Sequence, residues 1–538
     1  MARRLRHRQT KGPATDGPDL NSEATDAATR QRSGKAQCQT PDMYAKRESD
    51  ESIVPAKRAN KTGPSRAETP AAESVEERGS TKRNARPATT PRTLSRTDRE
   101  EALARVRAVA ARDKQVQFTA LLHHVNEAML VESFYALKRE AAPGIDEVTW
   151  RQYERDLRAK VADLHARVHR GSYRASPVKR VWIPKADGRQ RPLGIATLED
   201  KIVQQAVVTV LTQIYEEDFL GFSYGYRPGR AQHQALDAVS VGITRKKVNW
   251  ILDADIQGFF DNLDHEWMLK FLQHRIADKR ILRLVRKWLT AGVSEDGKRS
   301  KTTVGTPQGT VISPLLANIY LHYVLDLWVD WWRAKHARGD VIIVRYADDF
   351  IVGFQHRSDA EHFRRALDQR LAKFGLSLHT EKTRLIEFGR YAAKNRRDRG
   401  DGKPETFDFL GLTHLCGQSR KGWFCVERRT AGKRMRSKLQ ELKMQLRRRM
   451  HWPIREVGAW LKSVLRGWFH YHAVPGNILR LRQFRRALSK LWRQTLRRRS
   501  QKGTKWNWAR FNRICDPWIP YPKLAHPWPQ QRLLVDLR

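Results

Sequence analysis

The sequence is poor in cysteine and contains no long apolar run. Its four cysteines are scattered and form no Cys-x-x-Cys pair, which argues against a disulfide framework or a structural zinc site and favours a reducing compartment. His414, two residues from Cys416, is accordingly assigned to the core and not to a metal site. No apolar stretch approaches the roughly 18 residues that a membrane-spanning helix needs. Internal repeats are absent, and residues 1–6 lack the apolar segment of a secretory signal.

Acidic residues are also in the minority. The 538 residues include 103 lysines and arginines against 58 aspartates and glutamates, which gives a formal net charge of +45. This excess extends along most of the chain and predicts a polyanionic partner. Because neither a membrane span nor a lipidation signal is present, nucleic acid is favoured over a membrane surface. Hydrophobic residues make up 40% of the chain, which is enough for a sizeable globular core.

The composition changes along the chain. Residues 1–95 almost lack aromatic and β-branched periodicity, so this segment cannot bury enough apolar surface to fold and is expected to be a disordered basic tail. Apolar residues recur at helical spacing from residue 118 to 137, and a long helix is expected from 198 to 219. Basic helices are expected between residues 433 and 499, whereas the Trp- and Pro-rich residues 502–538 are expected to be irregular.

The most informative stretch of the sequence is residues 341–352. Two apolar, β-branched runs flank the sequence Tyr-Ala-Asp-Asp at 346–349, which predicts a buried hairpin with two adjacent carboxylates at its tip. Neighbouring negative charges raise each other's pKa unless a cation neutralises them, and hard cations such as Mg²⁺ prefer carboxylate oxygens. The alternative is a tight turn whose acids merely face water.

A second apolar strand, residues 250–254, also ends in acids. Strand periodicity places Asp253 and Asp255 on the same face, and either carboxylate could reach Asp348 and Asp349 if the two strands are neighbours. Three converging carboxylates form the ligand set of a two-metal phosphoryl-transfer site. In such a site the metal ions lie about 3.5–4 Å apart and contact the attacking and leaving oxygens.

Three further segments are candidates for ligand contacts. A hairpin with an Asp-Gly turn is expected from residue 181 to 195, with Lys185 and Arg191 placed to grip a triphosphate, although basic residues on hairpins are usually just solvated. The loop 305–314 leads into an apolar helix and would present main-chain N–H groups to a ligand. Basic helices with interleaved aromatics after residue 428 suit a surface that follows a nucleic-acid backbone and stacks bases. An ordinary solvated helical bundle is the alternative.

Together and in this order, the segments resemble the reverse transcriptases/maturases encoded by bacterial and organellar group II introns. The resemblance extends from about Leu121 to Pro529 and is specific because it rests on several ordered motifs. The motifs that carry it are Pro143-Gly144-Ile145-Asp146, Pro184-Lys185 to Gly194-Ile195, Phe222 to Arg230, Asp255-Ile256-Gln257-Gly258-Phe259-Phe260, Thr306-Pro307-Gln308-Gly309, Tyr346-Ala347-Asp348-Asp349, Phe407 to Thr413, and Arg466-Gly467-Trp468 to Tyr471.

The resemblance implies an α+β right-hand polymerase fold, with fingers, a palm that contains an antiparallel sheet, and a helical thumb. It also implies divisions along the chain. These are the disordered tail 1–95, the N-terminal extension and fingers 96–235, the palm 236–427, the thumb or maturase domain X 428–501, and a C-terminal tail 502–538 as a DNA-contacting segment.

Roles for individual residues follow from the same resemblance. Asp255, Asp348 and Asp349 would be catalytic and would hold the metal ions together with Ile256, while Asp253 would be a structural or supporting acid. Phe260 would be the steric gate that excludes a ribose 2′-OH. The other nucleotide-binding residues would be Lys185, Arg191, Gln308 and Gly309. The contacts to RNA or DNA would come from Arg227, Arg230, Arg447, Arg448, Arg449, Arg466, Trp468 and Tyr471.

The implied activity is synthesis of DNA from dNTPs on an RNA template with a DNA primer, using two Mg²⁺ ions or Mn²⁺ as a substitute. The implied partners are the intron RNA, whose splicing the protein would assist, and target DNA, with a cytoplasmic, nucleoid- or ribonucleoprotein-associated location. Gln257 and Ala196 depart from the family's frequent basic residue and proline, and no His/Asn endonuclease motif follows domain X.

Three alternative functions stay open at this point. The first is an RNA-binding maturase with incidental polymerase activity, although all three carboxylates are present. The second is a related polymerase recruited to phage defence or DNA repair, against which the thumb motif at residues 466–472 counts. The third is a template-independent nucleotidyltransferase.

Overall fold

The computed structural model of the chain describes residues 91–184, 190–295, 297–300, 304–419 and 421–532. The predicted tail 1–95, apart from its last five residues, therefore lies outside the described residues, and so does Lys185. The first described helix begins at Pro91, six residues before the charged helical pattern that begins at Thr97.

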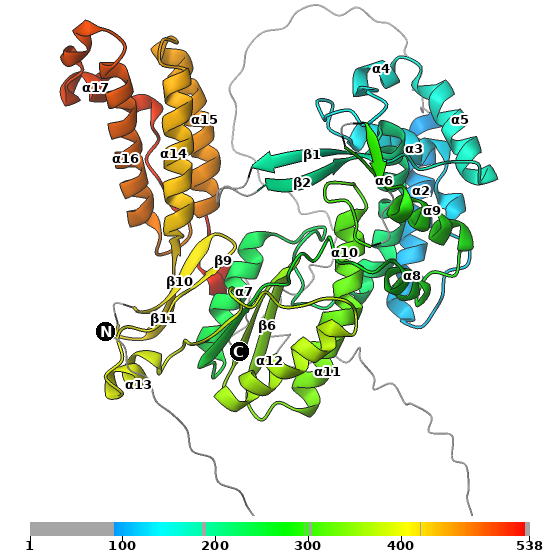
Figure 1. Cartoon of the computed structure of the whole chain (residues 1–538), viewed down its shortest axis with the longest axis horizontal. Coiled ribbons are helices and arrows are strands. Elements are labelled where there is room, and N and C mark those ends of the chain that lie inside the picture. Colours follow the sequence, from blue (N-terminus) through cyan, green and yellow to red (C-terminus); the bar gives the residue numbers. More distant parts are fainter. Residues whose placement is uncertain (1–90, 185–189, 296, 301–303, 420, 533–538) are drawn as a thin grey trace, which may run out of the picture. The chain divides into compact units, whose positions relative to one another are not determined.

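The N-terminal helices pack around one long, mostly buried helix, α6 (Figure 1). The Thr197 hydroxyl caps α6 by accepting a hydrogen bond from the Asp200 amide, and Glu199 and Asp200 lie in its first turn, where negative charge is favourable. Helices α2 and α3 pack against it. The bounds are α2 (Pro91–Arg112), α3 (Glu127–Ala136), α4 (Trp150–Glu154), α5 (Leu157–Arg170) and α6 (Leu198–Asp218).

A small sheet follows the helices in the order β2-β1-β4-β5. Strands β1 and β2 pair in antiparallel fashion, with Ile183 opposite Arg191, so the predicted hairpin is confirmed, although residues 185–189 of its turn lie outside the described residues. The strands are β1 (Val178–Pro184), β2 (Gln190–Ile195), β4 (Val293–Glu295) and β5 (Lys298–Ser300).

The second sheet has the order β6-β7-β3-β8, and all its pairs are antiparallel. Alternate residues of its strands enter different cores: Val341 and Ile343 pack with α12, and Ile342 and Val344 pack with α7. The sheet is therefore covered by helices on both faces (Figure 1). The elements are β3 (Trp250–Ala254), β6 (Val341–Tyr346), β7 (Asp349–Phe354), β8 (Arg384–Glu387), α7 (Gln232–Arg245) and α12 (Arg357–Ala372).

Helices also link β3 to β6. The apolar helix expected after residue 314 is interrupted, because α10 is followed by the π-helical turn η2 before α11 begins. The elements are α8 (His265–Gln273), α9 (Lys279–Thr290), α10 (Ser313–Leu321), η2 (His322–Asp326) and α11 (Leu327–Lys335).

The C-terminal part comprises a three-stranded antiparallel sheet and a helical bundle. The bundle has its own apolar core, in which Leu442, Leu465 and Trp492 come from three helices that run side by side in Figure 1. The elements are α13 (Ala392–Asp398), β9 (Phe407–Phe409), β10 (Leu412–Gln418), β11 (Phe424–Thr430), α14 (Gly432–Arg448), α15 (Ile454–His472), α16 (Ile478–Arg497), η3 (Gln501–Lys505), α17 (Trp508–Ile514), η4 (Asp516–Trp518) and α18 (Pro529–Arg532).

These elements confirm the predicted α+β class with an antiparallel sheet, whereas the β2-β1-β4-β5 sheet is mixed because β1 and β4 pair in parallel. The segment after residue 501 contains short helices and is less irregular than expected. In the part of the chain that the structure describes, every helix is too short or too polar to cross a bilayer.

Candidate active site

The predicted hairpin at 341–352 is confirmed, and its turn is tight. Tyr346 at the end of β6 pairs with Asp349 at the start of β7, which leaves Ala347 and Asp348 as the two turn residues. Ala347 has a φ of 59°, in the left-handed region that residues with a side chain seldom adopt. The two adjacent carboxylates therefore lie at the tip of a hairpin whose strands are buried.

Strand β3 brings a third carboxylate to this turn. It pairs with β7, with Ala254 opposite Phe350, so Asp255 follows at the end of β3, where β7 begins. Asp253, Asp255, Asp348 and Asp349 all line one pocket of about 710 Å³. The condition on which the sequence argument depended, that the two strands are neighbours, is met.

Like charges crowd this pocket. Burial among protein atoms raises the pKa of Asp349 to about 7, and the charges of Asp348, Asp255 and Asp253 act in the same direction. Because Asp349 is exposed at the pocket mouth, the crowding of carboxylates is the firmer of these causes. Burial also raises the pKa of Asp348, with the charge of Asp255 adding to the shift. A bound cation would relieve this repulsion.

Two basic side chains partly neutralise the carboxylates from the side of β8. The Lys382 ammonium contacts Asp255 Oδ2, and Arg384 Nη2 lies 3.5 Å from Asp253 Oδ2. Burial raises the pKa of Asp253 to about 6, although Arg384 opposes that shift. The sequence argument missed Lys382 and Arg384, because no local pattern marks them and only strand pairing brings them to the pocket.

The donor set fits a hard divalent cation, because it consists of carboxylate oxygens. Among the described residues, however, no three carboxylate, histidine or cysteine groups are gathered closely enough to hold an ion. The Lys382 ammonium contacts Asp255 Oδ2 and would compete with a cation for that oxygen. Ile256 is buried and has no ligating side chain, so only its main-chain carbonyl could contribute.

The candidate nucleotide-binding residues lie together, apart from Lys185. Arg191 lines the carboxylate pocket, and its Nε donates a hydrogen bond of 2.6 Å to Gln308 Oε1. Gln308 and Phe260, which is 7% exposed, line a neighbouring pocket of about 320 Å³. Gly309 has a φ of 105°, and a Cβ there would lie 2.6 Å from Leu193 Cδ1. Glycine thus lets this loop pack closely on β2.

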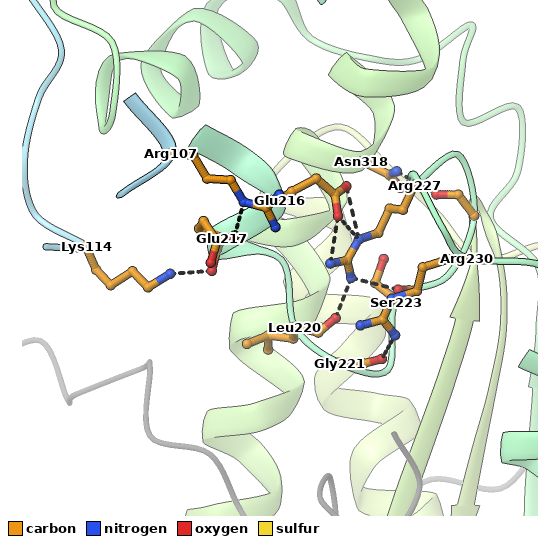
Figure 2. Close-up of polar contacts among 11 residues, drawn as sticks. Arg107, Lys114, Glu216, Glu217, Leu220, Gly221, Ser223, Arg227, Arg230 and Asn318 are labelled. Atoms are coloured by element: carbon orange, nitrogen blue, oxygen red, sulfur yellow. Dashed lines mark hydrogen bonds and ion pairs between the residues drawn. The ribbon is translucent and has the colours of Figure 1, made fainter. Parts of the chain in front are cut away.

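The prediction that Arg227 contacts nucleic acid is wrong, because its side chain is buried within the protein (Figure 2). Its side chain is 2% exposed, pairs with Glu216 at 3.1 Å, and donates hydrogen bonds of 2.8 Å to the carbonyls of Leu220 and Ser223. Its role is to hold the loop from within. Arg230, which donates to the Gly221 carbonyl at 2.7 Å, is partly exposed.

The residues proposed for RNA contacts in the C-terminal bundle fall into two groups. Arg447, Arg448 and Arg466 are exposed. The other group, Arg449, Trp468 and Tyr471, makes internal contacts. The Arg449 guanidinium lies 4.5 Å from the centre of the Trp460 ring, and the Trp468 ring stacks on Phe484.

Tyr471 connects the bundle to the carboxylate pocket. Its hydroxyl donates a hydrogen bond of 2.7 Å to the Leu410 carbonyl, and the Arg434 guanidinium lies 5.3 Å from the centre of its ring. Tyr471, Arg434 and Tyr226 all line the pocket. Arg434 and Tyr226 are further residues that the sequence argument did not identify.

Comparison with known proteins identifies a family whose match includes the carboxylates of this pocket. The family described as "Reverse transcriptase (RNA-dependent DNA polymerase)" matches residues 183–414, a range that contains Asp253, Asp255, Asp348 and Asp349 of the pocket. Protein YkfC of Escherichia coli (strain K12) is 32% identical over 277 residues, which are 45% of this chain and 72% of that protein.

Two further relatives are named for introns. The group II intron-encoded protein LtrA of Lactococcus lactis subsp. cremoris is 37% identical over 212 residues, which are 38% of this chain and 35% of LtrA. The putative COX1/OXI3 intron 1 protein of Saccharomyces cerevisiae is 29% identical over 40% of this chain and 31% of that protein. The match thus spans about a third of these two relatives. The chain belongs to the reverse transcriptase (RNA-dependent DNA polymerase) family, and within the matched region it is similar to proteins named for introns.

Proposed function

We propose that the protein is an RNA-directed DNA polymerase encoded by a group II intron, and that it binds intron RNA to assist splicing and mobility. The observation that carries the proposal is the shared pocket of Asp255, Asp348 and Asp349, with Arg191 at its edge. Carboxylates would hold divalent cations on one side of this pocket, and a guanidinium would meet the phosphates of a nucleotide on the other.

The described elements suit a right-hand polymerase. In this assignment the N-terminal helices and the β1–β2 hairpin form the fingers, residues 96–235, and the β6-β7-β3-β8 sheet belongs to the palm, residues 236–427. The α14–α16 bundle would be the thumb, residues 428–501, which is supported by its separate apolar core. Residues 502–538 would follow it as a segment that contacts target DNA.

Asp255, Asp348, Asp349 and the carbonyl of Ile256 would hold two Mg²⁺ ions, for which Mn²⁺ could substitute. When bound, the ions would stabilise negative charge on the attacking and leaving oxygens. The chain's own groups orient the substrate. Arg191 and Gln308, already hydrogen-bonded to each other, would align the triphosphate of a dNTP. Lys382 would hold the Asp255 carboxylate in place through their ion pair.

Discrimination between sugars would depend on Phe260. The ring is packed on Phe259, with ring centres 5.3 Å apart, and lines the pocket that Gln308 and Thr306 share. A ring fixed in this way would exclude a ribose 2′-OH from a sugar bound against it. The exposed Arg447, Arg448 and Arg466 would contact the phosphates of the RNA template, DNA primer or intron RNA.

Extension of a DNA primer on an RNA template with dNTPs and Mg²⁺ tests the proposal. Wild-type protein should extend the primer, whereas the double variant Asp348→Ala, Asp349→Ala should not, with matched circular dichroism spectra and RNA binding. If wild-type protein that is folded and binds RNA fails to extend any primer, the polymerase proposal is wrong. An RNA-binding maturase is then the favoured function.

A further inference from the structure

A fully buried ion pair lies directly behind the catalytic turn. Arg345, on β6, and Asp326, at the end of η2, are both 0% exposed. Arg345 Nε donates to Asp326 Oδ1 at 2.7 Å, and Nη2 donates to Oδ2 at 2.5 Å. This is the two-pronged geometry in which a guanidinium and a carboxylate interact most strongly and most directionally.

The remaining nitrogen of Arg345 holds the turn itself. Nη1 donates a hydrogen bond of 2.9 Å to the carbonyl of Ala347, the residue immediately before Asp348. The same nitrogen donates to Asn318 Oδ1 at 3.0 Å. Because Ala347 has a φ of 59°, its conformation persists only where the surroundings impose it. Arg345 supplies one such constraint from the buried side.

The loop 220–230 constrains the turn from a second direction. A Cβ on Gly225 would lie 2.2 Å from the Ala347 nitrogen, so the two backbones touch. Asn318 Nδ2 donates to the Gly225 carbonyl at 2.7 Å, and the Tyr224 amide donates to the Arg345 carbonyl at 2.8 Å. Arg227 stiffens this loop from within, as Figure 2 shows.

The π-helical turn explains how Asp326 reaches Arg345. In η2 the Leu327 amide donates to the carbonyl of His322, five residues earlier, in place of the usual four. A π turn adds one residue to a helical turn and so rotates the residues that follow it relative to those before. It ends at Asp326. Such turns are uncommon and are frequent at functional sites, which fits a turn that aims a carboxylate at the base of the active site.

We propose that Asp326 and Arg345 are positioning residues, which hold the Ala347–Asp348 turn in the conformation that lets Asp348 and Asp349 converge on a divalent cation. The proposal rests on the proposed polymerase function. Neither residue lines the carboxylate pocket, so both act through the turn and not through contact with the reacting atoms. Substitution of a purely structural residue would lower only the stability of the protein. Substitution of a positioning residue should also weaken cation binding.

The test compares Asp326→Asn with the control Asp218→Asn. Asp218 pairs with Arg275 at 3.0 Å, and the two side chains are 2% and 1% exposed, so this pair is equally buried but does not touch the turn. Both variants should melt at lower temperature. Only Asp326→Asn should raise the Mg²⁺ concentration for half-maximal primer extension by at least about tenfold and lower kcat, with the KM for primer–template unchanged.

A second readout does not depend on polymerase activity. Titration with Mn²⁺, followed by electron paramagnetic resonance, should show binding weakened at least about tenfold in Asp326→Asn and unchanged in Asp218→Asn. Asn318→Ala removes the amide that links Arg345 to Gly225 and supplies a milder variant if Asp326→Asn does not fold. It should weaken Mn²⁺ binding in the same direction.

Two results would overturn the proposal: Mn²⁺ binding as in wild type in both Asp326→Asn and Asn318→Ala, or a loss equally large in Asp218→Asn. If the wild-type protein itself does not extend primers, the polymerase function fails, but the Mn²⁺ comparison still decides whether the pair positions the carboxylates.

Discussion

Two hairpins supply the opposite charges of the candidate site, and they are held in very different ways. The strands of the β6–β7 hairpin are almost wholly buried, and its two-residue turn is tied to Arg345 beneath it. The β1–β2 hairpin instead exposes four consecutive residues, from Val181 to Pro184. The carboxylates are therefore fixed by the core, whereas Arg191 lies on an exposed edge.

This difference separates two kinds of defect. Substitutions of the buried hairpin should change cation binding and kcat, because they displace the carboxylates that are proposed to hold the cations. Substitutions of the exposed hairpin should change KM for the nucleotide, because the proposed role of Arg191 is to contact the triphosphate without supporting the fold.

The largest effect is expected for Asp348→Asn, which keeps the shape of the side chain but removes its charge. Primer extension should fall by about 10³-fold or more, because the loss of a metal ligand removes transition-state stabilisation. Asp253→Asn is the matched control in the same pocket, and since Asp253 pairs with Arg384, it should lose less than about tenfold. Single-turnover rates of primer extension measure the loss in each of the two variants. Equal losses would make Asp253 a metal ligand as well.

A smaller effect, on the choice of sugar, is expected for Phe260→Ala. Removing the ring should raise the use of ribonucleotides relative to deoxyribonucleotides by about 10- to 100-fold. Phe271→Ala is the control, because Phe271 is also buried and packs on Tyr320 but does not line the nucleotide pocket. Both variants should lose stability. Competition between rATP and dATP in primer extension measures discrimination, and unchanged discrimination in Phe260→Ala would exclude it as the gate.

On the exposed hairpin, Arg191→Ala should raise KM for dNTPs by about tenfold and leave the melting temperature nearly unchanged. The reason is that the variant loses two interactions of the guanidinium: the proposed hydrogen bond to the nucleotide phosphate and the hydrogen bond to Gln308. Arg299→Ala, on β5 of the same sheet, is an exposed control that lacks these contacts and should have no effect. A fall in kcat with unchanged KM would place Arg191 in the turnover step instead.

The two hairpins also show how far the sequence predicts the structure. Apolar, β-branched runs predict β6, β7 and β3, and the acids at their ends predict a shared site, because these signals are local. Lys382 and Arg384 carry no such signal; their position depends on β8 pairing with β3. The π turn is likewise invisible in an apolar run that predicts one continuous helix over residues 315–325.

Charged residues were the least predictable. Arg227 and Arg345 resemble other basic residues in the sequence, yet both are buried and paired, because neighbouring helical elements supply Glu216 and Asp326 as partners. Burial of an arginine depends on a partner that the fold supplies. Sequence alone therefore favours solvent or nucleic acid for each arginine, and errs where packing between elements supplies an acidic partner.

The smallest effect, a change in stability with pH, should arise outside both hairpins. His414 on β10 is fully buried and stacks on Phe407, and burial, with the charge of Arg428, lowers its pKa to about 3. Above about pH 6.5 this residue is neutral in the folded and unfolded states and contributes no pH dependence. As the pH falls below that value, only the unfolded state gains the proton, so stability should fall by about 1 kcal/mol per pH unit.

Urea unfolding of wild type and His414→Phe between pH 7 and pH 5 measures this slope. The variant should show a shallower fall, and the Mg²⁺ dependence of primer extension should be the same in both proteins. The change of unfolding free energy with pH would then arise from His414 in the β9–β11 sheet and not from the carboxylates of the candidate site. An identical slope in the two proteins would place the responsible groups elsewhere, with the buried His322, whose pKa is also lowered to about 3 by burial, as the next to replace.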